Sequence, residues 1–263
     1  MNMPVLLIVM IVGIVFFLPG GKNSELIGLL MQPVAFSIVI GGTFVASLIN
    51  FSYDTLINAI KSSTQVLRKK PDNKIKIIND IIQIAHYARH NSLLDLREII
   101  ENIENNFLRR GLQLATDIEN PQLLYDILGA EIAYDEEQEL INSRVFEAMG
   151  GYAPTFGIVG AVLGLIQAMS YIQNPQILAH GIATAFIATL YGVGIANLVF
   201  LPVAGNMKLK LREEVLFKEA ILQGIISITM KEAPAIVEEK LIAYLKYNNK
   251  NTLRQLKVGQ PVR

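Results

Sequence analysis

The chain has 263 residues with equal numbers of acidic and basic side chains, and 52% of its residues are hydrophobic while only 17% are charged. Soluble domains carry about 25% charged residues, but a single soluble domain could still reach this average, so the distribution of the charges decides the class. The absence of cysteine excludes a disulfide framework and thiolate metal sites. Asp, Glu, Lys and Arg are absent from four windows, residues 3–18, 33–51, 152–172 and 177–203. Since a membrane span needs about 20 apolar residues, we predict an all-α integral membrane protein with four transmembrane helices.

The first two windows form a predicted transmembrane hairpin over residues 1–52. The first window is short enough to suggest a cleaved signal peptide, but no Lys or Arg precedes it and residues 16–20 lack a small-x-small cleavage pattern. We therefore favour a span. In the second window, the small residues Gly41, Gly42 and Ala46 favour close helix packing in lipid.

The basic residues predict the orientation of the chain. Residues 53–151 and 206–263 each contain 11 Lys and Arg, whereas the short loop 19–32 contains only Lys22 and the loop 173–176 contains none. By the positive-inside rule, both long segments and both termini are cytoplasmic. The first segment carries 16 acidic residues and the second carries 6, so their net charges are opposite and we expect them to pack together.

The segment 53–151 is predicted to be a cytoplasmic loop of several short helices without strands. Apolar residues recur at helical spacing in residues 75–85, and an amphipathic run extends from Asn91 to Phe107. Gly111 is expected to mark a helix end or bend. Asn120 and Pro121 are expected to start a new helix, which is followed by an acidic stretch up to the third span.

The third and fourth spans, in residues 152–205, are the predicted functional pair. Gly157, Gly160 and Gly164 recur three and four residues apart and form one smooth face. Pro154 is expected in the first turn of the third span, where a missing N–H costs least. Thr184, Thr189 and Asn197 place polar groups at membrane depth, although threonines there usually bond their own helix. No Asp, Glu, Lys or Arg is present in these spans to carry an ion, and His180, near the outer start of the fourth span, is expected to face the interface.

The tail, residues 206–263, is predicted to continue the fourth span as a cytoplasmic helix over 208–228. A last short helix is expected at residues 235–245, and the polar end from residue 248 is expected to be frayed.

Catalytic motifs are missing from the sequence. His86, His90 and His180 are the only histidines and form no H-E-x-x-H motif, and neither G-x-G-x-x-G nor a Walker pattern occurs. A transporter acting alone would be expected to have broken helices or charged midplane groups. We therefore expect no enzyme activity, no cofactor, no metal site and no nucleic-acid binding.

Two motifs resemble a known family. These are Gly-Tyr-Ala-Pro-Thr-Phe-Gly-Ile-Val-Gly-Ala-Val-Leu-Gly-Leu at residues 151–165 and Ala-Thr-Leu-Tyr-Gly at residues 188–192. They look like the paired motifs of MotA/PomA, the ring subunits of the flagellar stator, and the resemblance covers nearly the whole chain. The wider superfamily includes ExbB and TolQ, proton-driven energy transducers that have three spans in a different order. The four predicted spans favour MotA/PomA, with an ExbB/TolQ-like transducer as the alternative.

The resemblance implies a torque generator in the bacterial inner membrane. Five copies would surround two MotB/PomB chains that each supply a membrane aspartate, and the cytoplasmic loop would push on the rotor protein FliG. Pro154 matches the family proline at the cytoplasmic end of the third span, and Thr189 matches the fourth-span threonine near the partner's aspartate. Pro234 matches a second family proline, in the tail. The implied ion-pathway residues are Pro154, Thr155, Ala161, Thr189 and Tyr191.

Ala161 bears on the transported ion in this comparison. Sodium-driven relatives tend to have threonine at this position and proton-driven relatives have alanine. Because a hydroxyl can replace part of the hydration shell of Na⁺, the alanine favours H⁺, with a sodium-driven PomA-type stator as the alternative.

The resemblance also places the rotor contact in the loop. Arg89 matches the family's basic residue, and the acidic partners implied are Asp95, Glu98 and Glu101. Arg97 departs from the family, because an acidic residue is usual at that position.

Overall fold

The computed structural model describes residues 30–67, 74–118 and 120–246, and these ranges are helical without any strand. The chain divides into two compact units. We call Met1–Lys69 with Glu139–Lys208 the span unit, and Lys70–Gln138 with Leu209–Arg263 the loop–tail unit. The predicted span at residues 3–18 and the predicted frayed end from residue 248 lie outside the described residues.

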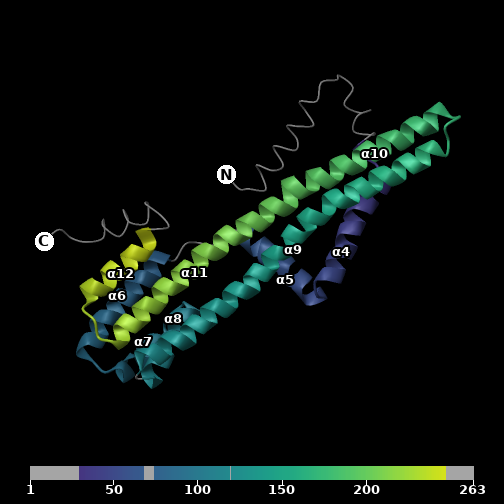
Figure 1. Cartoon of the computed structure of the whole chain (residues 1–263). Helices are drawn as coiled ribbons and strands as arrows, with labels where there is room; N and C mark the ends of the chain where they lie inside the picture. The colour runs from purple at the N-terminus through teal and green to yellow at the C-terminus, as the bar shows by residue number, and fades with distance from the viewer. Residues whose placement is uncertain (1–29, 68–73, 119, 247–263) are drawn as a thin grey trace. The chain divides into compact units, whose positions relative to one another are not determined.

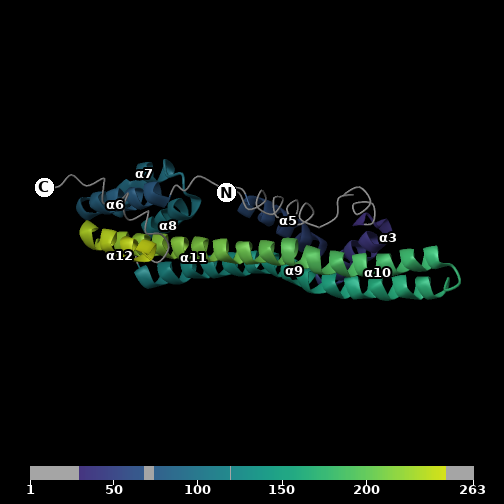
Figure 2. The same cartoon turned by 90° about the horizontal axis from the view of Figure 1, so that it is seen from above.

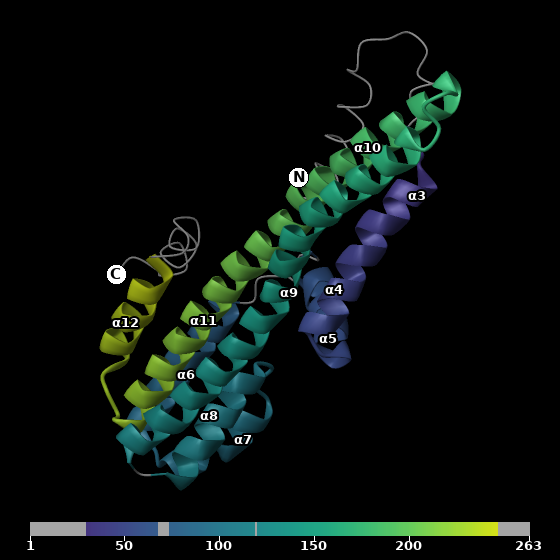
Figure 3. The ribbon, with the colours of Figure 1, turned by 45° about the vertical axis from the view of Figure 1, so that its right-hand side comes forward.

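The first described span is built from α3 (Pro33–Phe36), a π-helical segment η1 (Ser37–Gly41) and α4 (Gly42–Asn50). Pro33 begins the helix, where its missing N–H is tolerated. The helix ends at Phe51, whose backbone is extended. Ser52 then caps α5 (Tyr53–Leu67), because its hydroxyl accepts a hydrogen bond from the Thr55 N–H at 3.3 Å. Figure 3 shows the resulting bend between α4 and α5.

Helix α9 (Pro121–Met169) is a single helix of 49 residues. It starts as predicted, with Asn120 accepting hydrogen bonds from the N–H groups of Gln122 and Leu123. The expectation that Pro154 lies in a first turn is wrong, because it lies inside this helix. The sequence from 130 to 149 contains neither Gly nor Pro, so nothing ends the helix before the third span.

The last span begins in α10 (Pro175–Ile195), which is capped by the side chain of Asn174. It continues through a π-helical segment η3 (Ala196–Phe200) into α11 (Leu201–Thr229), which confirms the predicted helical extension. Three helices of the described chain are long and apolar enough to cross a membrane: Pro33–Asn50, Pro121–Met169 and Pro175–Thr229.

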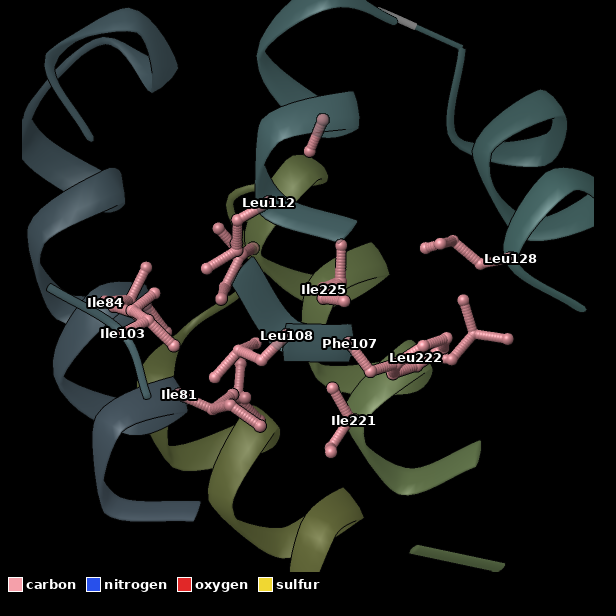
Figure 4. Packing of buried hydrophobic residues seen from close by; sticks show 14 of the residues in the cluster. Ile81, Ile84, Ile103, Phe107, Leu108, Leu112, Leu128, Ile221, Leu222 and Ile225 are labelled. Atoms are coloured by element: carbon pink, nitrogen blue, oxygen red, sulfur yellow. The ribbon is translucent and has the colours of Figure 1, made fainter. Parts of the chain in front are cut away.

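The loop–tail unit contains α6 (Lys74–His90), the 3₁₀ turn η2 (Leu93–Leu96), α7 (Arg97–Glu101), α8 (Asn106–Asp117) and α12 (Pro234–Lys246), with the adjoining ends of α9 and α11. Its core joins loop residues to tail residues, as Leu108 and Ile225 illustrate (Figure 4). Figure 2 shows α6 and α8 of the loop beside α11 and α12 of the tail. An ion pair between Lys218 Nζ and Asp135 Oδ2, 2.8 Å apart, links the two segments as well. The expected packing of loop against tail is therefore confirmed.

Two expectations for this unit need correction. The amphipathic run from Asn91 to Phe107 is interrupted between α7 and α8, and Asn105 caps α8 by accepting a hydrogen bond from the Leu108 N–H at 2.8 Å. Gly111 lies within α8 and does not mark the expected helix end. A Cβ at this position would lie 2.3 Å from Ile225 Cδ1, so glycine allows close packing of α8.

The turn from α11 to α12 uses a non-glycine residue with positive φ. Lys231 has φ 53°, and the Glu232 N–H donates to the Ser227 carbonyl at 3.0 Å. This hydrogen bond satisfies a carbonyl at the end of α11. The predicted last helix is confirmed as α12.

Candidate functional site

The third and fourth spans touch through small residues, and α9 and α10 lie side by side (Figure 1). A Cβ on Gly192 would lie 2.6 Å from the Ala153 carbonyl oxygen, and one on Gly157 would lie 3.1 Å from the Ala188 carbonyl oxygen. Farther along, a Cβ on Gly164 would lie 3.1 Å from the Ala185 nitrogen. The predicted smooth glycine face of the third span is therefore confirmed as its contact with α10.

The helix formed by α3, η1 and α4 packs on one side of this pair. A Cβ on Gly42 would overlap the Phe156 ring. The Tyr191 hydroxyl donates to the Leu30 carbonyl, and its ring meets the edge of Phe36 with centroids 5.9 Å apart.

Three of the predicted ion-pathway residues lie on the opposite side of the pair. Residues two positions apart on a helix point about 160° away from each other. Pro154 therefore points away from the side marked by Phe156, and Thr189 points away from the side marked by Tyr191. Ala161 is seven residues after Pro154 and shares its side. Pro154, Ala161 and Thr189, each half-buried, form what we call the open face of the pair.

Thr155 and Tyr191 do not belong to the open face. Thr155 is exposed, and its hydroxyl donates to the Tyr152 carbonyl of its own helix at 2.6 Å. Tyr191 is turned toward α3. Tyr191 therefore contacts a neighbouring helix through Phe36, and Thr155 forms a hydrogen bond within its own helix.

The polar groups of the fourth span bond mainly to their own helix, as the sequence suggested. Thr189 Oγ1 lies 3.3 Å from the Ala185 carbonyl, and Asn197 Nδ2 lies 2.9 Å from the Val193 carbonyl. Thr184 donates to the His180 carbonyl at 2.9 Å and also approaches the buried Gln32 amide oxygen at 3.4 Å. Within residues 33–50, 152–169 and 175–203 there is no Asp, Glu, Lys or Arg, so these parts of the spans offer hydroxyls but no proton-carrying carboxylate.

The predicted rotor-binding residues lie together in the segment from α6 to α7. Arg89 is in the last turn of α6, Asp95 is in η2, and Glu98 and Glu101 are in α7; all four side chains are exposed. Asp95 Oδ2 accepts a hydrogen bond from the Ser92 N–H at 3.0 Å.

Arg97, the residue that departs from the family pattern, pairs within its own unit. Its Nη2 lies 3.7 Å from Asp117 Oδ1, with both side chains about two-thirds exposed. Such an exposed pair contributes about 0–1 kcal/mol.

Pro234 is the buried first residue of α12, a position that favours proline. Beside it, hydrogen bonds from Lys240 and Ser227 hold the pKa of the Glu232 carboxyl below its ordinary value. This environment gives the turn a structural role.

Sequence reasoning missed three residues of the span unit. Gln32 is buried just before α3, Phe156 covers Gly42, and Pro202 is the second residue of α11, close after the π-helical segment η3. Only Pro202 had a local signal, since a proline in a long helical pattern removes a backbone hydrogen bond and disturbs the helix. The other two depend on which helix packs where.

The chain matches known proteins along most of its length. Residues 99–220 match the model of the MotA/TolQ/ExbB proton channel family. Motility protein A of Bacillus subtilis is 35% identical over 220 residues, covering 82% of this chain and 80% of the relative. Chemotaxis protein PomA of Vibrio alginolyticus is 29% identical over 219 residues, covering 83% of this chain and 86% of that protein.

A solved structure gives the same result for the fold. The flagellar MotAB stator complex from Bacillus subtilis matches with a TM-score of 0.84 and 31% identity, covering 98% of each chain. Together with the glycine-packed pair of spans, these similarities show that the chain belongs to the MotA/TolQ/ExbB proton channel family, on the branch that contains motility protein A and PomA.

Proposed function

We propose that this chain is the ring subunit of an ion-driven stator that turns the flagellar rotor. The observation that carries the proposal is the pairing of a glycine-packed helix pair with described spans that contain no carboxylate. Ion transfer through a membrane normally requires an ionisable group. A MotB-like partner supplies that aspartate, and the similarity to a MotAB stator complex supports this assignment.

The partner's aspartate approaches the open face formed by Pro154, Ala161 and Thr189. Among the described residues, α3 and α4 occupy the opposite side of the pair, and the open face is the side on which we place the partner chain. Thr189 provides a hydroxyl there, and the small side chain of Ala161 leaves space for a helix to approach.

The transported ion is H⁺ in this proposal. Ala161 offers no oxygen to replace the water around Na⁺, whereas a proton needs no such ligand. A swimming speed or torque that followed external Na⁺ and ignored the pH gradient would assign the chain to sodium transport.

The assembly is a pentamer in the bacterial inner membrane, with four spans and both termini in the cytoplasm. Residues 53–151 and 206–263 form the cytoplasmic part, which carries the rotor contact at Arg89, Asp95, Glu98 and Glu101. Exposed apolar side chains on the two long helices provide surfaces for lipid and neighbouring copies, including Ile158, Val162, Leu163, Ile166, Phe186 and Leu190. Native mass spectrometry of the complex extracted from membranes should count five copies with two partner chains.

Ion flux into vesicles tests the proposal directly. Vesicles containing this chain with its MotB-like partner should conduct protons, whereas vesicles with this chain alone, or with a partner whose membrane aspartate is replaced by asparagine, should not. Proton flux through this chain alone would contradict the need for an external carboxylate.

Thr189→Val tests the open face, and Thr184→Val is the matched control on the same helix. We expect Thr189→Val to assemble normally but to reduce proton flux at least about ten-fold, since it removes the only hydroxyl of the open face. Thr184→Val, on the side of α3, should lower stability by about 1 kcal/mol and leave the flux of assembled complexes unchanged. Equal flux in both variants would place the ion path elsewhere.

A further inference from the structure

Two of the three histidines occur together near the end of α6, in the sequence His-Tyr-Ala-Arg-His at residues 86–90. The glutamate of an H-E-x-x-H motif is missing, which removes the general base of a zinc enzyme. The spacing of the two imidazoles is nevertheless the same, since His86 and His90 are four residues apart. One helical turn is the separation that two-histidine metal sites on a helix use.

Both imidazoles lie on the exposed face of α6. The opposite face enters the core through Ile81, Ala85 and Ala88. Among the described residues, neither the His86 nor the His90 imidazole has a hydrogen-bond or ion-pair partner, and both side chains are exposed. Their χ angles are therefore free to bring the two rings together.

Helix geometry allows both rings to reach one metal ion. Side chains four residues apart have Cβ atoms about 5–6 Å apart. A zinc ion bound by two imidazoles has Zn–N distances of about 2.0–2.1 Å. The C-terminal end of α6, where His90 is the last residue, also carries the negative end of the helix dipole and favours a cation.

We propose that His86 and His90 form a two-histidine site for a divalent transition-metal ion of the class that prefers imidazole, namely Zn²⁺, Ni²⁺ or Cu²⁺. No group of three potential protein ligands occurs among the described residues, so water completes the coordination shell. The positive charge of Arg89, between the two histidines, opposes the ion. The site is therefore a weak one that responds to changes in free metal concentration.

Metal binding at this site would affect the rotor contact, and this consequence rests on the function proposed above. Arg89, the proposed basic contact to the rotor, is three residues after His86 and next to His90. A bound ion adds two positive charges to the same exposed surface and orders both rings. Metal binding should therefore change how this surface meets an acidic partner.

Metal titration of the purified full-length complex tests the site. Cu²⁺ and Zn²⁺ are added separately, with Cu²⁺ followed by electron paramagnetic resonance and Zn²⁺ by calorimetry. The wild type should show one site per chain with nitrogen hyperfine splitting from two imidazoles. His86→Gln and His90→Gln should each weaken binding at least about ten-fold.

His180→Gln is the control, because it removes the exposed lone histidine at the start of α10. It should leave the affinity and the nitrogen splitting unchanged. Binding that survives His86→Gln and His90→Gln, or that is lost in His180→Gln, would overturn the proposal. Glutamine forms helices well, so the two α6 variants should keep the wild-type circular dichroism spectrum.

A motility assay separates this site from the stator function. Cells with the wild-type chain should change swimming speed when micromolar Zn²⁺ reaches the cytoplasm through an ionophore, and cells with His86→Gln should not. If purified protein shows no two-histidine binding while cells swim normally, the metal site is wrong and the stator proposal stands. If metal binds as expected but the complex shows neither proton flux nor motility, the metal site stands and the stator proposal is wrong.

Discussion

Gly192 shows how a single residue brings two membrane helices into contact. A Cβ at this position would lie 2.6 Å from the Ala153 carbonyl oxygen and 3.0 Å from Gly157 Cα. Both atoms belong to the backbone of α9, so a rotamer change cannot relieve the overlap. Gly194 lies two residues farther along α10, and a Cβ there would meet nothing within 4 Å.

Gly192→Ala should therefore separate α9 from α10. We expect a loss of about 1–3 kcal/mol in stability, because the added methyl group overpacks a backbone contact. Gly194→Ala, the matched control, should be neutral or stabilising by up to about 1 kcal/mol through helix propensity. Thermal unfolding in detergent measures both. Equal melting temperatures for the two variants would contradict the described contact.

Glu232 makes the stability of the loop–tail unit sensitive to acid. Its pKa is lowered from the ordinary 4.5, first by the hydrogen bond from Lys240, at 2.6 Å in the closest contact, and then by that from Ser227. A lowered pKa in the folded state means that the stabilisation is complete above about pH 4.5 and disappears as the pH falls through the folded value.

Glu232→Gln should flatten this pH dependence. Between about pH 5 and 3, the protection factors of the α12 amides, which correct for the pH dependence of intrinsic exchange, should fall less in the variant than in the wild type, because glutamine does not titrate. At neutral pH, where the Glu232 carboxylate is charged, the α12 amides should be better protected in the wild type than in the variant. Parallel pH curves for the two proteins would show that the Lys240 contact does not stabilise the charged carboxylate.

Sequence patterns predicted the role of a residue well where spacing within its own helix was sufficient, without knowledge of the neighbouring helix. The spacing of Gly157, Gly160 and Gly164 was sufficient to predict a contact face. Tyr191 was assigned to the ion pathway by its motif, but the structure turns it toward Phe36 and α3. Nothing local to Tyr191 reports which neighbour lies on which side of α10.

At the scale of helices, the start marked by a capping side chain was predicted correctly, whereas the end expected at Gly111 and the start expected at Pro154 were not. Asn120 and Pro121 start α9 as expected because capping is a local interaction between a side chain and the first turn. Gly111 was read as a helix end because glycine has low helix propensity. Its place within α8 depends on Ile225, more than a hundred residues away in the sequence.

The contact of Gly111 with Ile225 predicts that two substitutions compensate. Gly111→Ala alone should destabilise by about 1–3 kcal/mol, since its Cβ would lie 2.3 Å from Ile225 Cδ1. Ile225→Val removes that carbon and should cost about 0.5–1.5 kcal/mol alone. The double variant should be more stable than the sum of the two effects, as measured by a double-mutant cycle.

Gly129→Ala is the control for this cycle. A Cβ on Gly129 meets nothing within 4 Å, so its effect should simply add to that of Ile225→Val. Additivity in the Gly111 cycle as well would show that α8 and α11 are not in the described contact.

For the whole molecule, composition and hydropathy predicted the class, and charge predicted which segments associate. The chain is helical as expected, and the acidic loop packs with the basic tail in one compact unit. The sequence did not show that α9 and α11 each continue from one compact unit into the other. The change from an apolar to a charged surface resembles a domain boundary, although the backbone continues as helix across it.

The division into two units predicts local unfolding. Leu108 is fully buried in the loop–tail core, and Leu108→Ala should cost about 2–5 kcal/mol. Hydrogen exchange should then accelerate in α6, α8 and α12, whereas protection in α3, α4 and α10 should stay at the wild-type level. Faster exchange throughout the chain would show that the two units unfold as one.

The contact of Gly157 and Gly192 also restricts how force can pass through the span unit. Two backbones in direct contact leave no flexible side chains between them to absorb a displacement. A push on the open face cannot shift α10 and leave α9 behind. We therefore expect α9 and α10 to move as one body, so that a displacement applied to one helix also moves the other.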